Sequence, residues 1–397
     1  MSSSPVEKAP VVPSSRSAAV DPESAKTILP GPWDDVPPVA AEGGGVTLEE
    51  LQLAARNHGM QLEGLRYDIT PIGMHYLLIH FDVPYVDERA FRLDVGGHVR
   101  APLTLTLDDL RSRPSVTLPV TLECSGNGRA RLSPRPISQP WLNEAVGTAE
   151  WTGTPLAPVL EEAGVKDGAI EVVFTGHDRG VQGGIEQDYE FSVPVEEALR
   201  PEVLLAYGIN GQPLPPQHGF PLRVIVPGWY GMTHVKWLKR VTVVTEPFGG
   251  YQKAEAYRVT ERQEAHGTNV TRILPRSLMV PPGIPDFITR VRLLPPGPVV
   301  LQGRAWSGRG PVEQVEVSTD GGSTWGEAAL ESPVSAHAWR RWTFPWEPSR
   351  PGDHELVSRA TDAAGNIQPV EQPWNLKGHT NNLVQRVRVL VRPDVPL

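Results

Sequence analysis

The chain has 397 residues, of which 39 % are hydrophobic and 21 % charged, and its formal net charge is −9. This length and composition indicate a globular protein of two or three domains. The acidic balance argues against a nucleic-acid binder with a basic face, and no apolar run is long enough to span a membrane as a helix. The single cysteine excludes an intramolecular disulfide and a multi-cysteine zinc or iron–sulfur site, and no C-x-x-C-H sequence offers covalent haem attachment in this chain.

Residues 1–45 are rich in Pro, Ser and Gly and end in Gly43-Gly44-Gly45, which predicts a flexible tail. They hold neither a twin-Arg pair nor an apolar stretch typical of an export signal, which favours a cytoplasmic over a periplasmic location. Thr47 and Glu50 then form the pattern of a capping box, which predicts a short helix beginning at this point.

Residues 46–245 alternate between strand-like and helix-like stretches, and Pro and Gly interrupt the pattern often. The strand-like stretches are FRLDVGGHV, IEVVFTG, LRVIVPG and VKWLKRVTVVT, and the helix-like ones are LTLDDLRSR, TPLAPVLEEAGV and VPVEEALRP. This order predicts an α+β domain with mixed sheets instead of a regular βαβ series. No G-x-G-x-x-G or P-loop sequence supports nucleotide binding.

Residues 246–275 have the character of a linker that crosses a domain boundary. From residue 276 to 397 the chain consists of short alternating strands separated by turn signals, and Asp320-Gly321-Gly322 is a strong hairpin turn. This pattern predicts an immunoglobulin-like β-sandwich held by its packed core, since it contains no cysteine.

The only cysteine, Cys124, lies in the sequence L-E-C-S-G-N-G-R, directly after the predicted strand VTLPVTLE. Two glycines and an asparagine around it predict a tight loop that brings a thiolate and backbone N–H groups close to a ligand. A buried, inert thiol is the ordinary alternative. Such cysteines usually lie within apolar strands or helices, however, and not in a loop of this kind.

Four basic or imidazole side chains follow within 19 positions. His218 and Arg223 lie in P-P-Q-H-G-F-P-L-R, and His234 and Lys236 lie in V-P-G-W-Y-G-M-T-H-V-K-W-L. Each alone is more often a surface or otherwise satisfied residue. Together they indicate an anion site, because Arg and Lys suit phosphate.

These three motifs, in this order and spacing, resemble the molybdenum domain of the sulfite oxidase family, and the C-terminal third resembles that family's dimerisation domain. The resemblance covers roughly residues 65–397. It implies a mixed α/β molybdopterin domain over 46–245 followed by the sandwich, one molybdenum–molybdopterin cofactor in each chain, no haem in this chain, and a homodimer.

The resemblance also implies roles for individual residues. Cys124 matches the metal ligand, and a soft thiolate suits a metal that cycles through two-electron reduction. In the family the remaining ligands come from the pterin dithiolene and oxo groups. The positions that match pterin contacts are His80, Asp178, His218, Arg223, His234, Val235 and Lys236.

Three further matches would face the substrate: Arg129, Tyr257 and Arg340, with Arg341 as the alternative if the register slips by one. Arg129 is anchored by the cysteine motif. The ordinary alternatives are a linker aromatic for Tyr257 and a strand-edge charge for Arg340.

One departure from the family pattern affects the pocket. The family's Arg-Asn-His before a V-P sequence is here Leu78-Ile79-His80, so a cation is missing, which weakens the binding of a doubly charged anion. Arg56-Asn57-His58 is a coincidental match, because Val83-Pro84 sets the alignment at His80. The stretch ITPIGMHY resembles the corresponding stretch in the subgroup of this family that includes the sulfane dehydrogenase subunit.

The expected activity is the molybdenum-dependent oxidation of sulfite to sulfate by oxo transfer, with electrons passed to an external acceptor, whether a cytochrome, another carrier or oxygen. One alternative is a related molybdenum enzyme, a sulfane-sulfur dehydrogenase or a sulfoxide-type reductase. A cofactor-free binding module built on the sandwich is another. That reading leaves Cys124, His218, Arg223 and Lys236 without a role.

Overall fold

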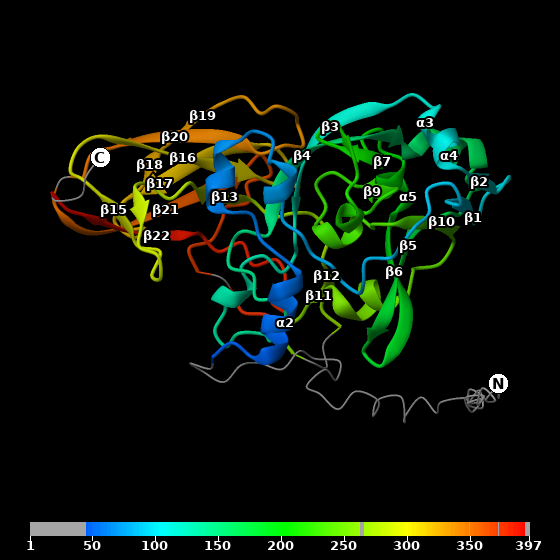
Figure 1. Cartoon of the computed structure of the whole chain (residues 1–397), viewed down its shortest axis with the longest axis horizontal. Helices are drawn as coiled ribbons and strands as arrows, with labels where there is room; N and C mark the ends of the chain where they lie inside the picture. Colours follow the sequence, from blue (N-terminus) through cyan, green and yellow to red (C-terminus); the bar gives the residue numbers. More distant parts are fainter. Residues whose placement is uncertain (1–44, 263–265, 349, 372, 394–397) are drawn as a thin grey trace, which may run out of the picture.

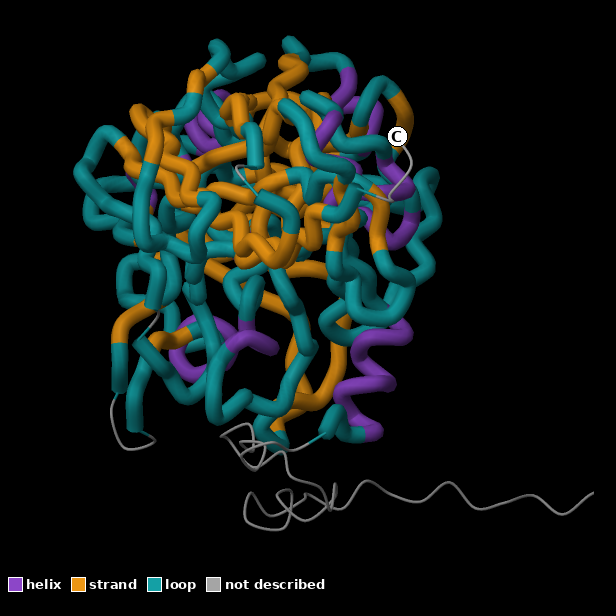
Figure 2. Tube along the Cα trace, turned by 90° about the vertical axis from the view of Figure 1, so that its left-hand side faces the viewer, coloured by secondary structure: helices purple, strands orange, loops and turns teal. Residues whose placement is uncertain are grey.

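The computed structural model describes residues 45–262, 266–348, 350–371 and 373–393, so the predicted N-terminal tail lies outside the described residues apart from Gly45. The chain forms two lobes side by side, a first lobe drawn in cyan and green and a second drawn in yellow to red (Figure 1). Strands and loops make up most of both, and the helices are few and short (Figure 2). None of the described helices is both long and apolar enough to cross a membrane.

The described chain begins with helix α2, Leu48–Arg56, followed by the 3₁₀ turns η1, Leu62–Arg66, and η2, Ile72–Met74. The predicted capping box is confirmed. The amide of Glu50 donates to the Thr47 hydroxyl at 3.2 Å, and the amide of Thr47 donates to the Glu50 carboxylate at 2.9 Å. The same carboxylate pairs with Arg135 at 2.9 Å and so attaches the helix to the first lobe.

The first lobe contains two sheets and few, short helices, which confirms the prediction of mixed sheets. One sheet has the order β2-β1-β10-β5-β6, and only its β1–β10 pair is parallel. The other has the order β3-β4-β7-β8, with β9 also paired to β7. The strands are β1 Leu93–Gly97, β2 Leu103–Leu105, β3 Val116–Glu123, β4 Val146–Pro155, β5 Glu171–Gln182, β6 Ile185–Pro194, β7 Leu204–Ile209, β8 Gln212–Pro213, β9 Arg223–Ile225 and β10 Leu238–Val244; the helices are α3 Leu107–Arg111, α4 Leu156–Ala163 and α5 Val195–Ala198.

The second lobe contains a four-stranded sheet, β13-β16-β20-β19, and a six-stranded sheet, β14-β15-β22-β21-β17-β18. Leu301 and Trp342 from the first of these pack with Val315, Leu356 and Val389 from the second in one buried cluster, so the two sheets share a core. The strands are β13 Arg276–Met279, β14 Ile284–Pro285, β15 Arg292–Leu294, β16 Val299–Trp306, β17 Val312–Ser318, β18 Gly326–Glu327, β19 Ala329–Leu330, β20 Arg340–Trp346, β21 Gly352–Asp362 and β22 Arg386–Val391. The predicted hairpin at Asp320-Gly321-Gly322 is confirmed, since it connects the antiparallel strands β17 and β18.

Between the lobes the chain forms a short π-helix, η6 (Gln252–Ala256), and a two-stranded sheet of β11 (Arg258–Val259) and β12 (Thr268–Asn269). The hydrophobic core of the first lobe continues into the second lobe. Leu278, Trp306 and Trp339 of the second lobe belong to the same buried cluster as the first lobe's strands. The two lobes are therefore joined by a packed apolar interface.

Candidate active site

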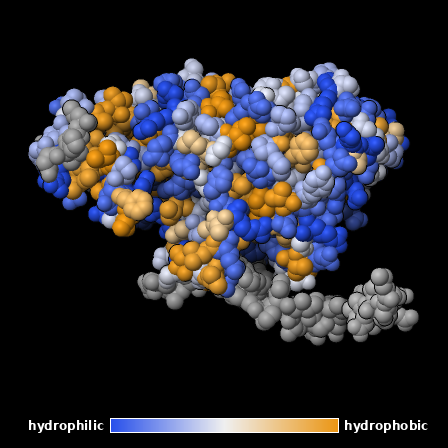
Figure 3. Space-filling view, in the orientation of Figure 1, coloured by the Kyte–Doolittle hydropathy of each residue, from blue (hydrophilic) through white to orange (hydrophobic). Residues whose placement is uncertain are grey.

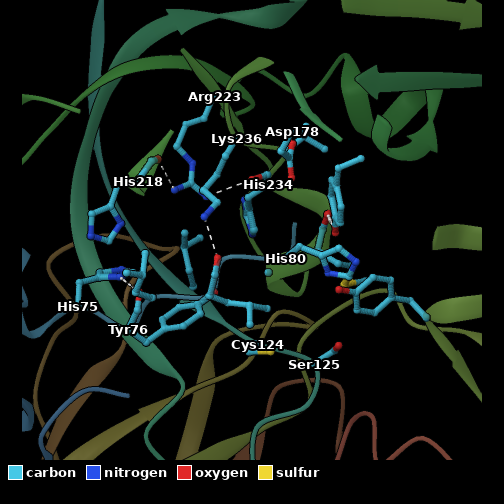
Figure 4. Close-up of a pocket in the computed structure, with 18 residues that line it drawn as sticks. His75, Tyr76, His80, Cys124, Ser125, Asp178, His218, Arg223, His234 and Lys236 are labelled. Carbon is cyan, nitrogen blue, oxygen red and sulfur yellow. Dashed lines mark hydrogen bonds between the residues drawn. The ribbon is translucent and has the colours of Figure 1, made fainter. Parts of the chain in front are cut away.

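One pocket of the first lobe gathers most of the residues singled out from the sequence (Figure 4). It lies beside the end of β3, and parts of β5, β6, β9 and the connecting segment contribute to its wall. The lining residues are His75, Tyr76, Leu77, Leu78, His80, Leu122, Cys124, Ser125, Asp178, Tyr189, His218, Arg223, Gly231, Met232, His234, Val235, Lys236 and Tyr257.

Cys124 and Ser125 lie at one end of the pocket, here called the thiol end (Figure 4). Tyr257 also lines the pocket, close enough to Cys124 for a charge on the thiol to raise the pKa of the phenol. The loop that presents Cys124 and Ser125 is tightly bonded: the amide of Cys124 donates to Ala145 O, and the amide of Asn127 donates to Cys124 O, each at 2.9 Å. Burial raises the pKa of the Cys124 thiol, and the charge of Arg129 opposes part of that rise. The thiol is therefore protonated until a bound metal displaces its proton.

The opposite end, here called the basic end, is formed by His218, Arg223, His234 and Lys236 (Figure 4). Arg223 donates to His218 O at 2.9 Å and to His234 O at 3.1 Å, and its guanidinium lies 4.7 Å from the Trp151 ring. Lys236 Nζ donates to Leu78 O at 2.7 Å and to Gln217 O at 3.1 Å. Backbone carbonyls thus hold both cations in place without neutralising them.

Three imidazoles of the pocket are neutral at physiological pH because they are buried. Burial lowers the pKa of His80 to about 4, that of His234 to about 3 and that of His218 to about 2. His234 is also fixed in its tautomer, since Val226 N donates to its Nδ1 at 3.0 Å and its Nε2 lies 3.0 Å from Trp229 O. His80 Nε2 lies 2.7 Å from the Gln182 side-chain oxygen.

Asp178 and Lys236 are a buried acid–base pair at the basic end. Burial raises the pKa of Asp178 to about 7. Burial, together with the neighbouring charge of Arg223, lowers the pKa of Lys236 to about 7. Neither group is well solvated in its charged form. A polar ligand that bonds both of them would therefore stabilise their charged forms.

Several buried polar atoms of the pocket have no hydrogen-bond partner among the described residues. They are Asp178 Oδ1, Arg223 Nε and His75 Nε2. An unpaired buried polar atom costs about 1–3 kcal/mol, so such a group indicates a site shaped for a polar ligand. A pterin that carries amide, amino and phosphate groups offers donors and acceptors for all three, and the soft thiolate of Cys124 suits molybdenum. The residues present therefore fit a molybdenum–molybdopterin group.

Tyr257 follows η6 and lies buried at the thiol end. Its ring centroid is 5.2 Å from that of His379 and 6.1 Å from that of Phe191. Burial raises the pKa of the Tyr257 phenol well above its ordinary value, so the hydroxyl remains a hydrogen-bond donor.

Arg129, at the start of the 3₁₀ turn η3 (Arg129–Arg131), lies behind the cysteine loop and is not among the pocket's lining residues. Its Nε donates to Lys377 O at 2.9 Å, and its Nη1 donates to the Ser138 hydroxyl at 3.1 Å. Two glycines make room for it: a Cβ on Gly126 would lie 2.7 Å from Nη2, and one on Gly378 would lie 2.6 Å from Cγ.

The structure does not bring Arg340 or Arg341, one of which the sequence predicts to face the substrate, to the lining of the pocket. Arg340 is a strand residue of β20 whose guanidinium donates to Glu331 O at 2.9 Å and to Val312 O at 2.6 Å. Arg341 pairs instead with Asp68 at 3.4 Å. Both side chains have acceptors within the second lobe or at η1, and neither is among the lining residues.

The sequence reasoning missed two sets of residues. His75, Tyr76, Ser125 and Tyr189 line the pocket directly. The segment 375–381 of the second lobe lies against the cysteine loop instead, and the side chain of His379 reaches Ser125 at 3.0 Å. A signal for this segment existed, because N-L-K-G-H-T-N-N is a long polar run between two strands without the pattern of a turn.

Comparisons with known proteins identify the family of this chain. Residues 80–252 match the model of the oxidoreductase molybdopterin binding domain, and residues 277–392 match that of the Mo-co oxidoreductase dimerisation domain. The mitochondrial sulfite oxidase of Mus musculus is 38 % identical over 346 residues, which cover 82 % of this chain and 62 % of that protein. The sulfite oxidase of Gallus gallus is 37 % identical over 78 % of this chain and 70 % of its own length. The chain belongs to the sulfite oxidase family.

The family extends to other activities and contains longer proteins. The NADH nitrate reductase of Solanum lycopersicum is 34 % identical over 81 % of this chain and 38 % of its own length. Among solved structures, the sulfane dehydrogenase SoxCD of Paracoccus pantotrophus superimposes with a TM-score of 0.73 at 24 % identity, over 88 % of this chain and 93 % of that one. That similarity shows the sulfite oxidase family fold. The chain spans about 62 % of the mammalian relatives it matches.

Proposed function

We propose that the protein is a molybdenum-dependent enzyme that oxidises sulfite to sulfate and passes the electrons to an external acceptor. One observation carries the proposal: a single buried thiol, Cys124, shares a pocket with the unpaired atoms Asp178 Oδ1, Arg223 Nε and His75 Nε2, in a chain of the sulfite oxidase family. When bound, the molybdenum–molybdopterin group supplies the two-electron redox chemistry and the transferable oxygen atom.

The pocket's residues divide this work between its two ends. Cys124 would hold the metal through its thiolate. At the basic end, Arg223 and Lys236 are cations held by backbone carbonyls, so they would bind the phosphate of the pterin. Asp178, His80, His218, His234 and Val235 line the same wall and would hold the pterin ring system.

The thiol end would receive the substrate. Arg129 lies close behind the cysteine loop, and its positive charge would attract and orient an oxyanion. The Tyr257 hydroxyl, kept protonated by burial, would donate a hydrogen bond to it. Arg129 and Tyr257 would keep their positions when the anion binds. Preorganised groups of this kind stabilise the charge that develops in a transition state.

A second candidate substrate is a less charged sulfur compound, such as a sulfane sulfur or a sulfoxide. Leu78 favours it, because this apolar side chain lines the pocket where the family commonly places an arginine. With that cation missing, a doubly charged anion loses part of its electrostatic attraction, whereas a neutral substrate does not.

The assembly is also a proposal. Residues 276–397 would form an immunoglobulin-like sandwich that dimerises with a second copy, joined through the linker 246–275 to a catalytic domain at 46–245. The apolar side chains of Phe287 and Ile288, 87 % and 84 % exposed between β14 and β15, support a contact surface on this lobe. Hydrophobic and hydrophilic residues are otherwise interspersed on the face shown in Figure 3. The acceptor would be a cytochrome, another carrier or oxygen, in the cytoplasm or the periplasm.

The test is sulfite-dependent reduction of ferricyanide by molybdenum-loaded protein, with the metal content measured on the same sample. We expect turnover in the parent and none in Cys124→Ser. Near-normal turnover in that variant would contradict the ligand assignment. Turnover of a sulfane or sulfoxide substrate, without turnover of sulfite, would select the second candidate.

A further inference from the structure

A segment of the second lobe, residues 375–381, closes over the cysteine loop of the first. The amide of Thr380 donates to Ser125 O at 2.7 Å, and the side-chain amide of Asn381 donates to Gly128 O at 2.6 Å. Gly378 has φ +61°, a backbone conformation that favours glycine, and this brings the segment into van der Waals contact with Arg129. The second lobe therefore forms part of the support behind the thiol end.

The side chain of His379 contacts the cysteine loop of the first lobe at Ser125. The residue is 5 % exposed, and its backbone is held on both sides by Asn375: the amide of His379 donates to Asn375 Oδ1 at 3.0 Å, and Asn375 Nδ2 donates to His379 O at 2.9 Å. Its ring lies 5.2 Å from that of Tyr257. The imidazole is consequently fixed in position.

The hydrogen bonds of His379 determine its tautomer. Nε2 lies 3.1 Å from Ala256 O, and a carbonyl oxygen can only accept, so Nε2 carries the proton. Nδ1 must then be the acceptor. It receives the Ser125 hydroxyl at 3.0 Å and faces Arg129 Nη2 at 3.5 Å.

This acceptor completes the surroundings of the Arg129 guanidinium. Backbone carbonyls and a serine hydroxyl hold its other nitrogens: Nε donates to Lys377 O, and Nη1 donates to Ser138 Oγ at 3.1 Å and Gln139 O at 3.4 Å. On the side of Nη2, His379 is the partner that the structure provides among the described residues. A neutral imidazole accepts there, whereas a protonated one would repel the guanidinium.

We propose that His379 is a positioning residue for anion binding. As a neutral imidazole protonated on Nε2, it directs the Ser125 hydroxyl away from the thiol and sets the place of the Arg129 guanidinium beside Cys124. The second lobe thereby determines the affinity of a pocket whose metal and cofactor ligands all belong to the first. This inference rests on the proposed function only where it concerns an anionic substrate; the placement of Arg129 is a separate structural claim.

Two variants separate the two nitrogens of the ring. His379→Asn places an amide oxygen close to the position of Nδ1 and keeps the acceptor for Ser125 and Arg129. His379→Gln extends towards Ala256 O and keeps the donor there, but it removes the acceptor. Molybdenum content and the melting temperature of both variants, compared with the parent, show whether each one folds and binds the cofactor.

In molybdenum-loaded protein we expect His379→Gln to raise the KM for sulfite about tenfold while kcat changes by less than about threefold, because a bond to a charged group that positions the anion is lost. His379→Asn should keep KM within about threefold of the parent. A general loosening of the fold would instead lower kcat and metal content in both variants. Equal KM values in the parent and in His379→Gln would overturn the proposal.

The crystal structure of each variant tests the position of Arg129 independently of enzyme activity. We expect the Arg129 guanidinium to move in His379→Gln and to keep its place in His379→Asn. If the parent fails to oxidise sulfite but Arg129 still moves in His379→Gln, the proposed function fails and the positioning role stands. If Arg129 keeps its place in His379→Gln, the positioning role fails whatever the substrate.

Discussion

The two ends of the pocket are built in different ways. At the basic end, His218, Arg223, His234 and Lys236 come from 19 consecutive positions, and backbone carbonyls of the first lobe hold both cations. At the thiol end, the Cys124 loop depends on segments far away in the chain, since Ser125 and His379 are 254 positions apart. The proposed phosphate site is therefore local in the chain, whereas the surroundings of the thiol contain residues of both lobes.

The buried ion pair beneath the cysteine loop shows how strongly the lobes depend on each other. Glu123, at the end of β3, lies 2.7 Å from Arg276 Nε of β13, and both side chains are about 1 % exposed. The N–H of Arg276 does not point along the carboxylate, so the contact is an ion pair and not an aligned hydrogen bond. Trp306 Nε1 also donates to Glu123 Oε2 at 2.7 Å.

The largest expected effect comes from breaking this pair. Glu123→Gln should lower the free energy of unfolding by about 3–5 kcal/mol, because the Arg276 cation is left buried without a counter-charge. Urea denaturation of cofactor-free protein measures the loss. Glu327→Gln, at an exposed position of β18, is the matched control and should change stability by less than about 0.5 kcal/mol. A small loss in Glu123→Gln would contradict the dependence of the thiol end on the second lobe.

At the basic end, Arg223→Lys should reduce bound molybdopterin about tenfold or more, because lysine lacks the planar guanidinium whose two Nη groups donate to His218 O and His234 O while its Nε–H stays unpaired. Pterin fluorescence after release from the purified protein measures the content. Arg240→Lys, at an exposed position of β10, should leave it unchanged. Full pterin content in Arg223→Lys would show that a positive charge at this position suffices without the geometry of a guanidinium.

The pH dependence of stability tests whether a buried imidazole of the pocket wall is neutral. Burial lowers the pKa of His75 from 6.5 to about 4. Between these two pH values the imidazole is therefore mostly protonated in the unfolded chain and mostly neutral in the folded one. This contribution to stability is present above pH 6.5 and is lost as the pH falls towards 4, at no more than about 1.4 kcal/mol per pH unit. Urea denaturation of cofactor-free His75→Phe should show a shallower loss between pH 6.5 and 5 than the parent. Identical slopes would contradict the neutral, buried state of His75.

The smallest expected effect concerns the missing cation. Leu78→Arg should lower the KM for sulfite about fivefold, a gain of about 1 kcal/mol, because a partly exposed cation attracts the anion only modestly. Leu78→Met, which adds no charge, is the control for altered packing. A higher KM for sulfite in Leu78→Arg, together with unchanged metal content, would favour the less charged substrate.

By itself, the sequence determined those features that arise from neighbouring residues. The capping box at Thr47 and Glu50, the tight loop around Cys124 and the cationic cluster between His218 and Lys236 follow from spacing over a few positions, because capping, turns and strand alternation depend on short-range sterics and hydrogen bonds. The cysteine loop and the cationic cluster also carry the resemblance to the molybdenum domain of the sulfite oxidase family.

Only the tertiary structure decided which distant segments meet. It pairs β1 with β10 in parallel across more than a hundred positions, directs Arg340 to the carbonyls of its own lobe, and brings His379 to Ser125. No local pattern encodes these contacts, because each joins separate segments of the chain, either within one lobe or, for His379 and Ser125, across the interface between the lobes. The basic end of the pocket could therefore be predicted from the sequence, whereas the contacts that support the Cys124 loop at the thiol end could not.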